Sequence, residues 1–447
     1  MRTLLVAASL AVAGAAGPIL GEVPVRAGGP DEAPLGVVYT GRQGGGSVRM
    51  VPIGAAAGRP LLLVDVEVEC GGFTPEGRGV ALVEDDGRFE IELTATDTDT
   101  TDSVRGVFDD IDGKVRPDGA VLEIDVEVEG EDNAGPTGRC EETQQWRLRG
   151  RRDPGAARID GAVRVDADEV ATGGDAVFTL DDGEGRRGTV RRVEPRSLRP
   201  TWRANASGDS VAIAAAGDAV WVLDDSALTV TRSDAATGDE VATVPLEPPG
   251  VAREVAAVFT PLVATPSGVW VGIDDAEQLY RVDGVTNEVA VRVPTPGGVQ
   301  ALAPAPDGVF AGVSSPDRAS RGGRLVRLDD TGTELAAVEL DDAADAVAFD
   351  GTTVWVRHIL GGITQHDPVT LAPRDGRLEL SPTALVDGLV AAPPGAWVST
   401  ERGLLAVDDS LARAGTVPVV GAGSPLSAAG FDALWVVDTG YLVRVAT

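Results

Sequence analysis

The stretch Gly217-Asp218-Ala219-Val220-Trp221-Val222-Leu223-Asp224-Asp225 decides the fold, because it recurs with variations down the C-terminal two thirds of the 447-residue chain. Each copy is a short apolar strand that opens with turn residues and carries one aromatic side chain at a fixed place. The aromatic positions are Phe178, Trp221, Trp270, Phe310, Trp355, Trp397 and Trp435. Their intervals are 43, 49, 40, 45, 42 and 38 residues, which is typical of a chain built from repeated supersecondary units.

Each repeat has the same order of segments around its aromatic strand. A strand of small residues comes first, as in residues 211–215, and a turn and the aromatic strand follow. A third strand, such as 279–283, and a fourth, such as 240–246, close the unit. Four strands in about 40 residues form one blade of a β-propeller. We therefore predict an all-β chain with a seven-bladed β-propeller over residues 155–447, whose aromatic side chains pack between neighbouring blades.

The ends of the repeat region predict how the ring closes. The last unit has strands near 426–429, 434–437 and 441–445, and it has no fourth strand of its own. A spare strand, 157–165, precedes the first unit, after an expected domain boundary at Pro154-Gly155. We expect this strand to complete the last blade, because the pairing would give hydrogen-bonding partners to two otherwise bare edges.

Residues 36–152 alternate apolar and polar side chains with a period of two, most clearly in 61–69, 88–93 and 121–129. Strands with this pattern bury one face and expose the other. No helical period of any length interrupts them. The sequence therefore predicts an N-terminal domain that is an antiparallel β-sandwich or barrel.

The first 35 residues have the features of an exported chain. Residues 1–21 combine Arg2, an apolar run and small residues, as a secretory signal peptide does. Residues 22–35 are rich in Pro and Gly and are expected to form a flexible leader. The two cysteines, Cys70 and Cys140, are expected to form a disulfide in an exported protein, with free thiols or a metal pair as alternatives. We predict a secreted or extracellular protein without a transmembrane segment.

The charge is strongly acidic, with 70 Asp and Glu against 38 Lys and Arg and a formal net charge of −32. Such a surface repels phosphate backbones, so nucleic-acid binding is not expected. It favours cations and basic partners, and a simply solvated surface is the alternative. The row Asp97, Asp99 and Asp102 is suited to calcium, but it lacks the glycine and the distal glutamate of an EF-hand loop. A solvated loop is the better interpretation of that row.

Three segments of the repeats carry a family resemblance: Ala219-Val220-Trp221-Val222, Gly268-Val269-Trp270-Val271 and Arg281-Val282-Asp283-Gly284-Val285-Thr286-Asn287-Glu288-Val289. They resemble exported bacterial seven-bladed propellers related to the quinoprotein amine dehydrogenase β-chain and to streptogramin (virginiamycin B) lyases. The resemblance implies the propeller fold. For the lyases it also implies a site of histidine and glutamate around a magnesium ion, which does not match this sequence residue by residue.

The N-terminal domain has a weaker resemblance of its own. It rests on residues 39–41, on 104–108, and on Cys140 followed by Trp146 and the basic end Arg147-Leu148-Arg149. These segments are similar to a β domain of exported bacterial proteins. The resemblance implies no defined activity.

A candidate ligand site follows from the residues three places after each aromatic, where the second strand of each blade ends. These residues are Asp181, Asp224, Ile273, Val313, His358, Thr400 and Asp438. In a propeller, the ends of the second strands converge on one face. With Asp274 and Glu401 included, the sequence predicts a ligand-binding funnel formed by Asp181, Asp224, Asp274, His358, Glu401 and Asp438. The alternative is that each aspartate only makes a good turn residue.

The only histidines, His358 and His366, are eight residues apart around Gly361-Gly362. With Asp367 they form a candidate metal site, and either histidine is a candidate general base. Two surface-loop histidines are the alternative. The sequence contains no Gly-x-Ser-x-Gly, no phosphate-binding loop with a lysine and no His-Glu-x-x-His motif.

Together these features predict a secreted, monomeric, non-catalytic protein whose propeller binds a partner, glycan, peptide or cation through its funnel. The only cofactor suggested is a divalent cation. The main alternative is a metal-dependent lyase or hydrolase that uses His358 and the acidic ring. A third interpretation is a structural surface protein in which the propeller is a rigid spacer.

Overall fold

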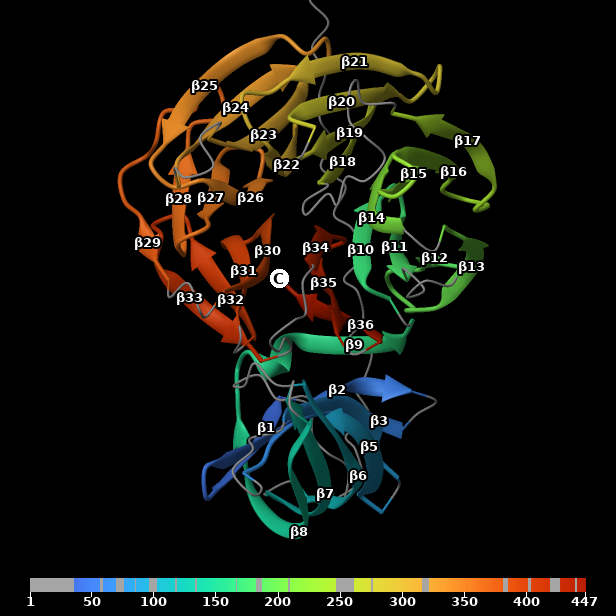
Figure 1. The fold of residues 1–447 in the computed structure, drawn as a ribbon, viewed down its shortest axis with the longest axis vertical. Helices are drawn as coiled ribbons and strands as arrows, with labels where there is room; N and C mark the ends of the chain where they lie inside the picture. Colours follow the sequence, from blue (N-terminus) through green and yellow to red (C-terminus); the bar gives the residue numbers. More distant parts are fainter. Residues whose placement is uncertain are drawn as a thin grey trace, which may run out of the picture.

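The computed structural model describes residues 36–56, 59–69, 76–84, 86–95, 103–116, 119–132, 135–165, 167–181, 187–207, 210–246, 261–274, 276–315, 321–380, 385–400, 403–418, 427–438 and 440–447. The signal peptide, the leader, the Asp97–Asp102 row and Cys70 lie outside these residues, so those predictions stay untested. The described residues form strands β1 to β36 and one short 3-10 helix, η1 (Ala156–Arg158). The chain is therefore all-β, as its repeats and alternation predict (Figure 1).

The N-terminal domain is a single eight-stranded antiparallel sheet. Its strands are β1 (Val37–Gln43), β2 (Gly46–Ala56), β3 (Arg59–Glu67), β4 (Glu76–Leu82), β5 (Arg88–Ala95), β6 (Ser103–Arg116), β7 (Gly119–Asp132) and β8 (Gly135–Arg152). Their order is β4-β3-β2-β1-β8-β7-β6-β5. The two edge strands, β4 and β5, contact each other where Gly79 lies against Leu93 and Ile91. The domain is therefore a nearly closed barrel, one of the two architectures that the alternation predicted.

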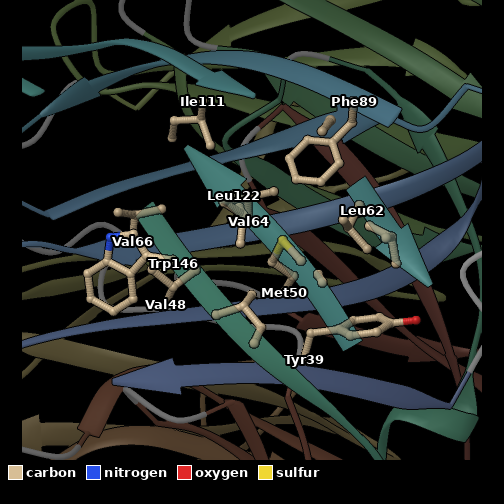
Figure 2. Packing of buried hydrophobic residues seen from close by; sticks show 14 of the residues in the cluster. Tyr39, Val48, Met50, Leu62, Val64, Val66, Phe89, Ile111, Leu122 and Trp146 are labelled. Carbon is tan, nitrogen blue, oxygen red and sulfur yellow. The ribbon is translucent and has the colours of Figure 1, made fainter. Parts of the chain in front are cut away.

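The barrel interior is filled by the apolar side chains of the alternating strands. Leu62, Val64 and Val66 of β3 point inward and are buried, and Trp146 of β8 packs with them. Figure 2 shows this packing, with Met50 between the strands. The alternation therefore places the apolar side of each strand toward one shared core.

The propeller has seven four-stranded sheets; six are paired in sequence order from the inner to the outer strand, and the seventh takes its outer strand from before blade 1. Blade 1 comprises β10 (Glu169–Gly173), β11 (Ala176–Asp181), β12 (Thr189–Val193) and β13 (Pro200–Asn205), and blade 2 comprises β14 (Ser210–Ala216), β15 (Ala219–Asp224), β16 (Thr229–Asp234) and β17 (Glu240–Pro245). Blade 3 comprises β18 (Leu262–Thr265), β19 (Gly268–Ile273), β20 (Gln278–Asp283) and β21 (Val289–Pro294), and blade 4 comprises β22 (Val299–Ala305), β23 (Gly308–Ser314), β24 (Gly323–Asp329) and β25 (Glu334–Leu340).

The remaining blades repeat the same plan. Blade 5 comprises β26 (Ala344–Phe349), β27 (Val354–His358), β28 (Gly362–His366) and β29 (Leu378–Glu379), and blade 6 comprises β30 (Leu385–Ala392), β31 (Gly395–Thr400), β32 (Gly403–Asp408) and β33 (Arg413–Val417). Blade 7 comprises β34 (Ser427–Gly430), β35 (Ala433–Asp438), β36 (Tyr441–Ala446) and β9 (Ile159–Arg164). The predicted number of blades is confirmed.

The repeated aromatic side chains join each blade to the next. All seven are buried, and each packs into the core that its own blade shares with the following one. Trp221 of blade 2, for example, packs with Val269 and Val271 of blade 3, and Trp435 of blade 7 packs with Val177 of blade 1. The aromatic period therefore marks the contacts that hold the ring together.

The ring closes through β9, the strand that precedes blade 1 in sequence. β9 pairs antiparallel with β36, from Tyr441↔Arg164 to Val445↔Ile159. The Arg444 guanidinium also pairs with Asp160 at 2.7 Å. The predicted closure is confirmed: the last blade takes its outer strand from the N-terminal side of the propeller.

The barrel docks on this closing strand. Outer-face side chains of the barrel, including Ile53, Leu61 and Leu63, share an apolar core with Ile159 and Ala162 of β9. β2 and β9 lie side by side, and Figure 1 shows the barrel against this part of the ring. The solid apolar run of β3 is therefore buried on both faces, by the barrel interior on one side and by the propeller on the other.

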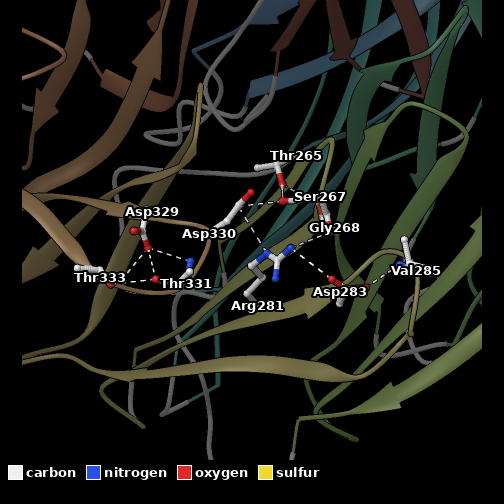
Figure 3. Close-up of polar contacts among 10 residues, drawn as sticks. All are labelled: Thr265, Ser267, Gly268, Arg281, Asp283, Val285, Asp329, Asp330, Thr331 and Thr333. Carbon is white, nitrogen blue, oxygen red and sulfur yellow. Dashed lines mark hydrogen bonds and ion pairs between the residues drawn. The ribbon is translucent and has the colours of Figure 1, made fainter.

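A second set of contacts between blades is polar and lies at the turns that join third and fourth strands. Arg281 of β20, itself buried, donates to Ser267 O at 3.1 Å and pairs with Asp330 of blade 4 at 3.5 Å (Figure 3). In the equivalent place, Arg232 donates to Asn287 of blade 3, and Arg444 donates to Pro195 O of blade 1. These arginines link the third strand of one blade to the turn of the next.

Candidate functional site

The loop face of the propeller carries the connections between second and third strands, and the predicted funnel residues lie there. Asp181 is 3.9 Å from the Arg191 guanidinium of its own blade. Asp224 accepts a hydrogen bond from Ala227 N at 2.7 Å, as a turn residue does. The Asp274 carboxylate lies against Gly298, the backbone that leads into blade 4. Each aspartate therefore has a separate local contact.

The structure describes only part of the predicted acidic ring. Glu401 lies outside it, and so does the side chain of Asp438, whose backbone ends β35. The described residues contain no group of three His, Cys, Asp or Glu side chains that could hold a metal ion. A shared cation at the ring stays a prediction.

The structure does bring the two histidines together, around one threonine. The Thr364 hydroxyl lies 2.8 Å from His358 Nε2 and 3.0 Å from His366 Nε2. Each Nδ1 faces a backbone carbonyl, of Asp342 at 2.7 Å and of Leu371 at 3.0 Å, so each Nδ1 must donate. Both rings are buried, contrary to the alternative of surface-loop histidines. Both Nε2 atoms are therefore acceptors, and the single hydroxyl proton of Thr364 can be donated to only one of them at a time.

Burial lowers the pKa of both His358 and His366 below the ordinary value, so both are neutral at pH 7. Asp367 does not join them. Its Oδ1 accepts hydrogen bonds from the backbone N–H groups of Val369 and Thr370, and those bonds lower its pKa. Asp367 is the turn residue after the third strand, where Asp234, Asp283, Asp329 and Asp408 make the same kind of turn in their blades.

The loop face of blade 5 gathers four charged side chains, of which Asp342 and Arg357 are buried. Asp342 accepts from Leu360 N at 3.1 Å and from Arg377 at 3.3 Å, both through Oδ2. Its Oδ1 is buried and has no hydrogen-bond partner among the described residues. Beside it, the buried Arg357 guanidinium donates to Asp345 at 2.8 Å. We call Asp342, Asp345, Arg357, His358 and Arg377 the blade-5 cluster.

A hollow adjoins this cluster on the loop face. Its lining comes from the connections and strand ends of blade 4: Pro296, Ser314, Ser315, Arg321, Gly322, Gly323, Arg324, Glu339, Leu340 and Asp341. The hollow ends at the residue that precedes Asp342. Side chains of both charges line it, with two serine hydroxyls and glycine backbone between them, so it suits a polar ligand rather than an apolar one.

The sequence reasoning found His358 but missed the rest of the blade-5 cluster. A signal was present: Arg357 stands two residues after Trp355, where the other blades have Leu, Gly, Ser or Val. The run Asp341-Asp342 before the inner strand β26 is the other half of that signal. Both departures from the repeat lie at the same end of one blade.

Glu169 is a further unusual carboxyl, at the start of the inner strand β10. Burial, with the neighbouring charge of Asp168 as a smaller cause, raises the pKa of Glu169 to about 8. No cation pairs with it among the described residues. At pH 7 this group is therefore mostly protonated, so it adds little negative charge to the loop face.

The fold and this site define a class: a seven-bladed β-propeller with an N-terminal barrel and a polar, partly buried cluster on its loop face. No family model matches the chain, and no curated protein matches its sequence. No helix of the described residues is long and apolar enough to cross a membrane.

Solved structures resemble the chain in fold. BamB from Moraxella catarrhalis is 14% identical with a TM-score of 0.47, over 74% of this chain and 94% of that one. Hydrazine synthase from Kuenenia stuttgartiensis is 13% identical with a TM-score of 0.48, over 64% and 96%. The β-propeller domain of Cps50 (Swd1) from Myceliophteria thermophila is 11% identical with a TM-score of 0.49, over 64% and 98%. At these identities and scores the likenesses carry no conclusion on function.

Proposed function

We propose that this protein is a non-catalytic binding protein that takes a polar ligand, a glycan or a peptide, on the loop face of blades 4 and 5. The observation that carries the proposal is the blade-5 cluster. Burying charged groups costs free energy, and a buried carboxylate oxygen without a donor costs more. Asp342 Oδ1 is such an oxygen, and the preceding residue, Asp341, lines the hollow. A ligand N–H or O–H that reached it would recover that cost.

The features of the first 35 residues support an exported location for this binding protein. The net charge of −32 supports partners that are neutral or basic at this face. The resemblance to streptogramin lyases supports the alternative, a metal-dependent lyase or hydrolase, less well. In that alternative only Nε2 of His358 could bind a metal or take a proton, because Nδ1 donates to Asp342 O. That Nε2 lies 2.8 Å from the Thr364 hydroxyl, which it shares with His366.

A ligand screen followed by paired variants tests the proposal. The full chain is screened against glycan and peptide arrays, and each hit is measured by isothermal titration calorimetry. The double variant Arg321→Gln with Asp341→Asn changes two charged side chains that line the hollow. It should weaken the binding of a ligand that occupies the hollow by about tenfold. Arg199→Gln with Asp239→Asn is the matched control, because both residues are exposed and lie at turns on the opposite face.

The proposal fails if no array ligand binds, or if the control pair weakens binding as much as the hollow pair does. Turnover of a defined substrate that is lost in His358→Gln would favour the enzymatic alternative instead. Circular dichroism of each variant shows whether the fold is retained.

A further inference from the structure

The outer face of β6, β7 and β8 carries a set of cations that the propeller site does not use. Strands β5 to β8 contribute no residue to the apolar contact between barrel and propeller. On their outer face, Arg116, Arg147 and Arg149 are exposed and Lys114 is half-buried. Two of these residues belong to the basic end of β8 that the sequence already singles out.

The strand register arranges these cations as two walls. Lys114 of β6 pairs with Val121 of β7, which pairs with Arg147 of β8. One row further, Arg116 pairs with Gly119, which pairs with Arg149. Adjacent strands lie about 4.8 Å apart, so the two walls are about 10 Å apart, and residues on one wall are about 7 Å apart.

Between the walls, β7 supplies a low floor without charge. Gly119 has no side chain, and Val121 is 56% exposed although it is apolar. We call Lys114, Arg116, Gly119, Val121, Arg147 and Arg149 the basic trough. The row Asp112, Glu123 and Gln145 bounds it at one end, where the outer face becomes acidic.

The cations of the basic trough have no counter-charge of their own. No ion pair or side-chain hydrogen bond joins any of the four to the described residues, whereas arginines such as Arg49, Arg281 and Arg444 are paired. Carboxylates are abundant in a chain of net charge −32, so four neighbouring cations without one stand out. Two of the four are arginines on one strand, spaced to meet successive anionic groups.

We propose that the basic trough binds a linear acidic polysaccharide, laid along β7 with its anionic groups against the two walls. A linear polymer fits two parallel walls, and an apolar side chain with a glycine leaves room for sugar rings on the floor. Charge-assisted hydrogen bonds from arginine to carboxylate or sulfate provide the binding energy. Repeated anionic groups on a stiff chain lose little conformational entropy on binding.

Three other anionic partners fit the trough less well. An acidic peptide cannot add its backbone to the sheet, because β6, β7 and β8 are all paired on both sides. A single-stranded nucleic acid would find no aromatic side chain to stack on among the trough residues, and Trp146 of β8 is buried inward. An anionic membrane is flat and would meet much of the acidic surface around the trough.

The test measures binding of the full chain to alginate and heparin oligosaccharides, as carboxylated and sulfated probes, by isothermal titration calorimetry at two salt concentrations. Arg147→Gln with Arg149→Gln removes one wall and should weaken binding by about tenfold or more and reduce its salt dependence. Arg199→Gln with Arg413→Gln removes the same charge from exposed positions on the propeller and should change affinity by less than about twofold. Unfolding curves confirm that both variants are folded.

The proposal is supported if at least one oligosaccharide binds and only the wall variant loses affinity. It is overturned if neither oligosaccharide binds, or if both variants lose affinity equally, which would indicate a response to net charge alone. Tighter binding of poly-glutamate, of an oligonucleotide or of phosphatidylglycerol vesicles than of either oligosaccharide would also overturn it, because each would assign the trough to another partner.

Discussion

At the scale of single residues, Glu169 shows how burial adjusts one charge. Its pKa is about 8 in the folded protein and near 4.5 in the unfolded chain. The folded state therefore keeps a proton that the unfolded state releases, and this contribution to stability is lost as the pH rises from about 4.5 to about 8. The slope is at most about 1.4 kcal/mol per pH unit.

Replacing Glu169→Gln should remove this slope and make the variant relatively more stable at pH 8 than at pH 5. Urea unfolding of wild type and of the variant at both pH values measures this difference in stability. Taking the difference between the proteins cancels the opposite effect of the two buried histidines, whose lowered pKa values favour the folded state as the pH rises. Identical pH dependence in both proteins would contradict the shifted pKa.

At the scale of the element, the third strand of a blade carries an arginine that fixes the next blade. Arg281→Met keeps the length of the side chain and removes its contacts with Ser267 and Asp330. Because Arg281 is buried, we expect the free energy of unfolding to fall by ~1–3 kcal/mol in urea titrations. The same substitution at an exposed position, Arg413→Met, should lower the free energy of unfolding by less than about 0.5 kcal/mol.

A double-mutant cycle with Asp330→Asn separates the link between the blades from the packing of Arg281. We expect a coupling free energy of about 0.5 kcal/mol or more. Simple additivity would mean that Arg281 acts within blade 3 only, through Ser267 and its own strand.

The sequence predicts elements better than it predicts side-chain partners, and blade 5 shows why. Trp355 recurs in a fixed pattern because every blade must bury an apolar face against its neighbour, so its place in the fold follows from the period. The partners of Asp224, expected in the acidic ring, and of Asp367, expected with the histidines, are set instead by the local turn that each residue makes. The spacing of the repeats therefore predicts the strand on which each residue lies, but it predicts only part of the candidate site.

At the scale of the whole molecule, the barrel and the propeller form one apolar unit across β9. Ile53→Asp would put a carboxylate among Leu61, Ile159 and Ala162, where it cannot be hydrated. We expect wild type to unfold in one calorimetric transition and this variant to show two, the first at a lower temperature. Val121→Asp, on the exposed outer face of the same barrel, should leave the single transition intact. Two transitions in wild type would contradict this coupling.

The interface between the barrel and the propeller left a signal in the sequence, but it was not predicted. The apolar run at 61–64 interrupts the alternation of β3, and such an interruption indicates a strand that is covered on both faces. The similar run at 121–122 has no cover, because Val121 is exposed. An apolar run alone does not show whether β3 or β7 meets the propeller. The position of β9 decides that β3 does.

The way blade 7 is assembled has a consequence for how the protein is made. Asp160 and Arg444, which pair within that blade, are 284 residues apart. During synthesis from the N-terminus, β9 leaves the ribosome early, and the barrel can cover its apolar side chains while its outer-blade partner does not yet exist. The barrel would then keep the apolar side chains of β9 covered until β36, its partner strand in blade 7, is translated.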